Sequence, residues 1–417
     1  MSTAFANPAY SARFHSFTDQ PDSDSCWSLH TGPDGRVYAA ACIEHTSGRT
    51  VTVLRYNDET DSLDPLFEMD KVTGDLRDSG RATQCKIHYS FAPARQSGLL
   101  YAATHLSGPP KGERKYRAWG AWHDQRRAFR GAYLVAYDTV ADQPASVDLM
   151  IPKEGCRCLC LDEQRGRLYA LTYPRDHFVY YDLATRELHD VGRIGSVNSQ
   201  CLFLDKRSRV HFTNDHGRFL RFDPEQDRLE ELPHRFPHEP FQDGWHGVLY
   251  DAVSDPAGDW IYMVPWMVRP HLVRFRPDEG EHGRLEDLGA VNQPADVSHA
   301  LSMSLDHVGG LVFGLDQCLY YVRASWRAGA ELGGDFRRMA HAKGIVVRMD
   351  TRTLEREEVC VLHRPELSSS YATRGARDHA GNLYFGHVGI PPVGLFRMTV
   401  PDAGTAKDAH LPLRVWG

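Results

Sequence analysis

The sequence predicts an all-β fold, a seven-bladed β-propeller with four antiparallel strands in each blade. A turn containing Gly or Asp, followed by apolar–Tyr–apolar residues, occurs seven times along the 417 residues. Each copy follows a short strand-like segment and precedes another, which often ends in Asp and a turn residue. Helical periodicity is almost absent. A pair of β-sandwiches is the alternative, but its strands would not repeat in fours with the same Asp-ending third strand.

The predicted second strand of each blade carries the clearest copy of the repeat. The copies are PDGRVYAAACIE (33–44), QSGLLYAATHLS (96–107), QRGRLYALTYP (164–174), KRSRVHFTND (206–215), AGDWIYMVPW (257–266), VGGLVFGLD (308–316) and AGNLYFGHVG (380–389). We therefore expect a single domain over residues 1–417. Its blades are expected over approximately 25–72, 83–152, 155–195, 198–235, 244–290, 298–363 and 368–416. The N-terminal segment SARFHSFTD is a candidate to complete one blade, which the sequence leaves open.

Composition argues against several classes of protein. The formal net charge of −7 argues against nucleic-acid binding by bulk attraction. No apolar run is long enough to span a bilayer, and the first residues lack a basic segment followed by an apolar one. We therefore expect a cytoplasmic monomer with no membrane partner. The nine cysteines are an odd number without a CxxC pair, which favours buried thiols over disulfides.

Polar residues gather at one predicted mouth of the propeller. The first strand of a blade starts, and the second ends, at the same face, so these positions from all blades surround one opening. The predicted ring comprises His30, His88, Arg157, Gln200, His246, His299 and Tyr371 from first strands, and Cys42, His105, Tyr173, Asp215, Trp266, Asp316 and His387 from second strands. So many ionisable residues at equivalent positions indicate a functional site rather than a water-filled channel.

Two long loops, 107–131 and 317–344, are rich in Arg and aromatic residues and are predicted to open on the same face. Arginine pairs with carboxylate or sulfate, and aromatic faces stack on sugar rings. We therefore expect an acidic oligosaccharide or polysaccharide as the binding partner. The residues expected to bind it are Arg114, Arg117, Trp119 and His123 in the first loop, and Gln200, His246, Trp266 and His299 at the mouth.

The residues KIHYSF and LYAATH, followed by LYALTYP and GRIG, resemble the seven-bladed propeller polysaccharide lyases, which include the ulvan lyases and the rhamnose–glucuronate lyases. The resemblance implies β-elimination at a uronic acid, which leaves a 4,5-unsaturated uronate, with no cofactor required for the chemistry. It maps the histidine pair to His88 and His105, the catalytic tyrosine to Tyr173 and the carboxylate-binding arginine to Arg193. Without a secretion signal, imported oligosaccharides are favoured over whole polymers.

Those residue types suit the chemistry. The C5 proton of a uronate is weakly acidic while the carboxylate is charged, so Arg193 and a donating histidine would neutralise that charge. A tyrosine or histidine would then remove the proton and return one to the leaving oxygen.

Three alternatives stay open at the level of the sequence. A propeller glycoside hydrolase would use two carboxylates, for which Asp215 and Asp316 are the candidates. A carbohydrate-binding propeller without catalysis is the second alternative. A structural metal ion, zinc or calcium, held by His246, His299 and His387 is the third.

Overall fold

The computed structural model describes residues 9–44, 46–106, 108, 110–112, 124–196, 199–237, 247–266, 270–291, 308–325, 343–363, 372–389, 391 and 393–401. These residues form seven four-stranded sheets, which confirms the predicted all-β seven-bladed propeller. The helix Met69–Thr73 (α1) is the only helix in these ranges. Within them, no helix is long and apolar enough to cross a membrane.

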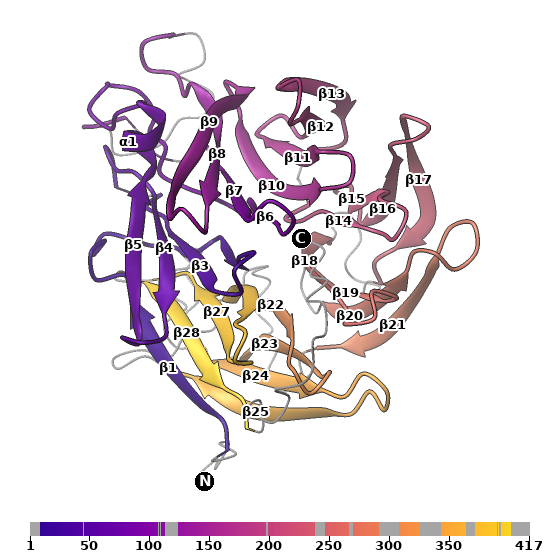
Figure 1. Ribbon diagram of the computed structural model, residues 1–417. Helices are drawn as coiled ribbons and strands as arrows, with labels where there is room; N and C mark the ends of the chain where they lie inside the picture. Colours follow the sequence, from indigo (N-terminus) through magenta and orange to yellow (C-terminus); the bar gives the residue numbers. More distant parts are fainter. Residues whose placement is uncertain are drawn as a thin grey trace. The chain divides into compact units, whose positions relative to one another are not determined.

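The chain divides into two compact units, and the first comprises residues 16–204, 391–394 and 417. It holds blades 1 to 3, drawn from indigo to magenta in Figure 1. Blade 1 contains β2 (Leu29–Thr31), β3 (Val37–Ala41), β4 (Thr52–Asn57) and β5 (Ser62–Glu68). Blade 2 contains β6 (Phe91–Ala94), β7 (Leu99–Ala103), β8 (Gly131–Asp138) and β9 (Gln143–Pro152). Blade 3 contains β10 (Gly155–Asp162), β11 (Arg167–Tyr173), β12 (His177–Asp182) and β13 (Glu187–Arg193).

The second unit comprises residues 1–15, 205–390 and 395–416. The fourth sheet contains β15 (Val210–Thr213), β16 (Arg218–Asp223) and β17 (Arg228–Arg235) of this unit, and β14 (Phe203–Leu204), whose two residues end the 16–204 range. The fifth contains β18 (Val248–Ser254), β19 (Ile261–Trp266), β20 (His271–Arg276) and β21 (Arg284–Ala290). The sixth contains β22 (Val308–Phe313), β23 (Leu319–Ser325), β24 (Lys343–Met349) and β25 (Arg356–Leu362).

The seventh sheet takes strands from both ends of the chain. Its order is β1 (Ser11–Ser16), β28 (Gly394–Thr399), β27 (Leu383–His387) and β26 (Ala372–Arg377). The indigo β1 lies beside the yellow β28 in Figure 1. Apolar burial accompanies this pairing, because Ala12 and Phe14 of β1 pack against a buried cluster that includes Phe396. The N-terminal segment therefore completes a blade, which the sequence left open.

In the sixth blade, the predicted strand order was wrong by one strand. VGGLVFGLD was predicted to contain the second strand, but Val308–Phe313 is the first strand, and 319–325 forms the second strand rather than the start of a loop. Close packing explains Gly309 and Gly310. A Cβ at Gly309 would lie 2.6 Å from the carbonyl oxygen of Ala372, and one at Gly310 would lie 2.9 Å from the ring of Phe385. Asp316 therefore lies in the turn between the first and second strands. Its carboxylate accepts hydrogen bonds there from Tyr320 and Arg348.

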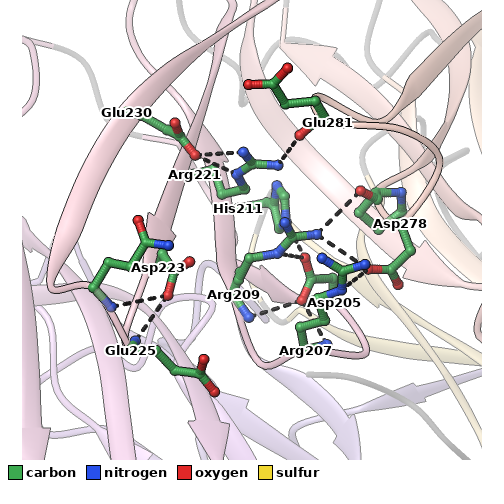
Figure 2. Close-up of polar contacts among 12 residues, drawn as sticks. Asp205, Arg207, Arg209, His211, Arg221, Asp223, Glu225, Glu230, Asp278 and Glu281 are labelled. Carbon is green, nitrogen blue, oxygen red and sulfur yellow. Dashed lines mark hydrogen bonds and ion pairs between the residues drawn. The ribbon is translucent and has the colours of Figure 1, made fainter.

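Buried polar contacts join the fourth blade to the turn that follows β20. The carboxylate of Asp205 lies 2.6 Å from Nε of Arg209 and 2.9 Å from Nε2 of His211, and both the Asp205 and His211 side chains are fully buried. Arg209 also donates to Asp278, at 3.2 Å (Figure 2). Burial opposes ionisation of Asp205, but the hydrogen bonds from His211 and Arg209 outweigh it and hold its pKa at about 2.

We expect Asp205→Ala to lower the free energy of unfolding by about 3 kcal/mol, because Arg209 would keep its buried charge without its nearest carboxylate. Asp205→Asn retains the shape and one acceptor and should lose less. Urea unfolding of the three proteins measures both effects. Because the folded pKa is depressed, the contribution of the ionised carboxylate is complete above about pH 4 and disappears as the pH falls towards 2. Equal stability of the alanine variant and the parent protein would contradict this role.

Candidate functional site

His88 and His105 meet at the irregular start of blade 2. Strand β6 begins only at Phe91, but upstream of it Lys86 forms a bridge with His105, whose N–H donates to the Lys86 carbonyl oxygen at 2.8 Å. A tight turn then follows, in which the N–H of Ser90 donates to the carbonyl oxygen of His88. The two imidazole rings are both buried, and their centroids lie 5.2 Å apart.

Blade 3 adds a tyrosine and an arginine to this pair. Tyr173 ends β11, and its ring stacks on the His105 ring at 4.6 Å between centroids. Arg157 lies on β10 at a β-bulge between Cys156 and Cys158, and its guanidinium carbon lies 5.1 Å from the centre of the Tyr173 ring. Both Arg157 and Tyr173 are partly exposed. Blades 2 and 3 thus bring four polar side chains together, which we call the His–Arg–Tyr cluster (His88, His105, Arg157 and Tyr173).

The close approach of the two blades requires a glycine. A Cβ at Gly155 would lie only 2.3 Å from the backbone nitrogen of Leu106, the residue after His105. Backbone hydrogen bonds join the blades on either side of Arg157. Cys156 donates to Thr104 at 2.9 Å, and Leu159 donates to Tyr89 at 3.0 Å. Gly155 therefore permits the backbone contact that places Arg157 beside the histidines.

Arg157 lies between the two imidazoles. Its Nη1 atom is 3.5 Å from Nε2 of His88 and 3.5 Å from Nε2 of His105. Nδ1 of His88 lies 3.0 Å from the carbonyl oxygen of Arg157. A carbonyl oxygen only accepts, so Nδ1 of His88 carries the hydrogen and its Nε2 lone pair faces the guanidinium.

The electrostatics of the cluster favour uncharged histidines. Burial lowers the pKa of both His88 and His105 well below the ordinary value, and the positive charges of Lys86 and Arg157 lower both further. At neutral pH both rings are therefore neutral and present lone pairs to Arg157. A protonated imidazole would instead present an N–H donor and a positive charge to the guanidinium and would repel it.

Arg193 lies outside this cluster. It ends the outer strand β13, pairs with His177, is exposed, and donates from Nε to the carbonyl oxygen of Gly195 at 2.9 Å. No contact within the described ranges joins Arg193 to the histidine pair or to Tyr173. Arg157 is the arginine that contacts them. Sequence reasoning included Arg157 in the mouth ring but assigned the carboxylate-binding role to Arg193, because the resemblance depended on order along the chain.

The other predicted site residues are distributed as follows. The positions outside the described residues are Arg114, Arg117, Trp119, His123, His246, His299 and Tyr371. Gln200 is buried, and Trp266 ends β19 opposite Val248. The ring of His387 packs edge-on against Phe14 and Phe396. The described part of the chain contains no group of three His, Cys, Asp or Glu side chains arranged to hold a metal ion.

Two members of the predicted ring, His30 and Asp316, need correction. His30 pairs with Tyr38, near the turn between β2 and β3. Cys42, which follows the second strand, pairs instead with Ser25. His30 therefore does not occupy the position in blade 1 that His88 occupies in blade 2. Asp316 occupies a turn between first and second strands, but Asp215 follows a second strand. These two kinds of turn lie at opposite ends of a blade, so Asp215 and Asp316 do not form the carboxylate pair expected for the hydrolase alternative.

Comparisons with known proteins extend only to the fold. No protein-family model and no curated protein matches the chain. Among solved structures, a streptogramin B lyase is similar over 96% of this chain and 100% of its own, with a TM-score of 0.57 and 12% identity. The WD40 repeats of RRP9 are similar over 95% and 99% of the two chains, with a TM-score of 0.55 and 9% identity.

A third similar structure is the extracellular domain of the hybrid two-component system BT4673 from B. thetaiotaomicron, with a TM-score of 0.57 and 11% identity. The match covers 93% of this chain, which spans only 39% of that longer one. These likenesses establish the fold alone.

The buried neutral histidines predict a dependence of stability on pH. Their folded pKa values lie below the ordinary value of about 6.5, so the unfolded chain binds protons that the folded chain excludes. Stability from this source is complete above about pH 6.5 and is lost as the pH falls towards the folded pKa values. We expect the Tm to fall between pH 7 and pH 5, and His88→Gln/His105→Gln to show a smaller fall. His177→Gln, outside the cluster, is the control; an identical fall in all three proteins would contradict this origin.

Proposed function

We propose that this protein is a lyase that cleaves the glycosidic bond to a uronic acid in an oligosaccharide by β-elimination. The observation that carries the proposal is the environment of Arg157. Its guanidinium touches two neutral imidazoles and the face of Tyr173, and within the described ranges it has no carboxylate partner. A partly exposed arginine held in this way has donors for an anionic ligand, and a uronate carboxylate is a matching planar acceptor.

Arg157 would bind and neutralise the substrate carboxylate. That neutralisation stabilises the negative charge that develops when the C5 proton is removed. His88 would act as a positioning residue, because its Nδ1 faces a carbonyl oxygen and its Nε2 faces the guanidinium. His105 would support both neighbours, with Nε2 towards Arg157 and its ring beneath Tyr173.

Tyr173 is the group proposed to transfer the proton. It is partly exposed, whereas both histidines are buried. As a phenolate it would take the C5 proton, and the electron pair of the C5–H bond would form the C4–C5 double bond while the C4–O bond breaks. As a phenol it would return that proton to the leaving oxygen, so that the residue ends in its starting form.

Tyr173→Phe removes only the hydroxyl group and should leave the fold and substrate binding intact. If that hydroxyl carries the proton, kcat should fall by roughly 10²-fold or more with little change in KM. The assay is the ultraviolet absorbance of the conjugated unsaturated product, measured across a panel of uronate-containing oligosaccharides. Wild-type turnover by the Phe variant would remove Tyr173 from the mechanism. Sugar binding without an unsaturated product would instead favour the non-catalytic alternative.

Two variants distinguish Arg157 from Arg193, the residue implied by family resemblance, as the arginine proposed to bind the substrate carboxylate. Arg157→Met should lower kcat/KM by about 10²-fold or more, because the substrate carboxylate loses its counter-charge. Arg193→Met is the matched control, and its effect should be much smaller because Arg193 lies on the outer strand. Steady-state kinetics on one accepted substrate measure both. A larger loss in the Arg193 variant would return the carboxylate-binding role to that residue.

A further inference from the structure

A second cation, Lys86, adjoins the histidine pair. The side chain of Lys86 is only 5% exposed, and its ammonium nitrogen lies 2.8 Å from Oε1 of Glu44. The same nitrogen lies 4.4 Å from the centre of the Trp27 ring. A buried lysine held by an ion pair and an aromatic face is costly to desolvate, so its position beside ionisable groups calls for an explanation.

Glu44 holds this assembly together. Its Oε1 atom accepts hydrogen bonds from the indole N–H of Trp27 and from the hydroxyl of Ser25, in addition to the contact with Lys86. The backbone N–H of Glu44 in turn donates to the carboxylate of Asp24 at 3.1 Å. The carboxylate of Glu44 is therefore held in place by groups from blade 1 while it neutralises a cation of blade 2.

Lys86 reaches both histidines by different routes. The Trp27 ring, beneath the Lys86 ammonium, stacks on the His88 ring at 4.8 Å and 18°. The carbonyl oxygen of Lys86 accepts the backbone N–H of His105. Lys86 thus adjoins the His88 ring through Trp27 and accepts the backbone hydrogen bond of His105.

We propose that Lys86 is a positioning residue of this site: the ammonium group that Glu44 holds against Trp27 places a fixed positive charge beside His88 and His105, and this charge preserves the Nε2 lone pairs that hold Arg157. The assignment of Arg157 to a substrate carboxylate rests on the proposed function, but the effect of Lys86 on the imidazoles does not.

The charged and titratable groups around the two rings support this role. Within blade 2, the two rings face each other, and the Tyr89 ring lies edge-on to that of His88 at 4.8 Å between centroids. Blade 3 contributes Arg157 and Tyr173. Blade 1 contributes Glu44, which accepts the indole N–H of Trp27. Of the two cations, Arg157 is the one that contacts the imidazole nitrogens, whereas the ammonium of Lys86 is held by Glu44 and the Trp27 ring. After burial, the Lys86 charge is the largest cause that lowers the pKa of each ring.

The test replaces each member of the ion pair in the full chain and follows the ¹⁵N signals of His88 and His105 against pH. Lys86→Met keeps the apolar stem and removes the positive charge, so protonation of both rings should begin about 1 pH unit higher than in the parent protein. Glu44→Gln removes the negative charge and should move protonation in the opposite direction. A merely structural role would move both variants the same way, because each would loosen the same packing.

Arg77→Met is the matched control, because it removes a cation paired with Asp70 in the same unit but outside the His–Arg–Tyr cluster. Its titrations should equal those of the parent protein. Unchanged titrations in both Lys86→Met and Glu44→Gln, or a change in one common direction, would overturn the proposal. Since the measurement needs no substrate, a protein without lyase activity whose titrations move as expected would contradict the proposed function while supporting the role of Lys86.

Discussion

The guanidinium group of Arg157 is the contact on which the candidate site depends. It faces Nε2 of both buried imidazoles and the ring of Tyr173, so it links residues of blade 2 to residues of blade 3. Its position follows from the backbone, because hydrogen bonds from Cys156 and Leu159 join the two blades on either side of it. A displacement of either blade would separate the arginine from the lone pairs that hold it.

The local charge of this region is opposite to that of the chain. The protein carries a formal net charge of −7, yet two cations, Lys86 and Arg157, lie close enough to the histidine pair to act on both rings. The two cations differ in their partners. Glu44 neutralises Lys86, whereas no carboxylate in the described ranges pairs with Arg157. Burial, together with the charges of Lys86 and Arg157, keeps the histidines neutral. The positive charge available to a ligand is therefore concentrated on one partly exposed guanidinium.

The sequence indicated that His88, His105 and Tyr173 lie close together, but it did not indicate that Arg157 is the arginine in contact with them. His88, His105 and Tyr173 could be found because strand ends recur at fixed places in a repeated blade. Arg193 was chosen from its order after Tyr173, but it lies on the outer strand β13, which β12 separates from the inner strands where the cluster forms. In the sixth blade, the apolar repeat matched an inner strand instead of a second one, because both are buried and apolar and periodicity does not distinguish them.

By itself, the sequence determined the fold class, because turn residues and apolar–Tyr–apolar segments act locally and repeat in every blade. It also placed two histidines and a tyrosine near the ends of adjacent strands. Only the tertiary structure decided that Arg157 contacts both imidazoles and that Lys86 is buried next to them. Those positions depend on the bulge at Cys156, on the space left by Gly155 and on the contact of Glu44 with Trp27. Such contacts join residues distant in sequence, and no local pattern of residues specifies them.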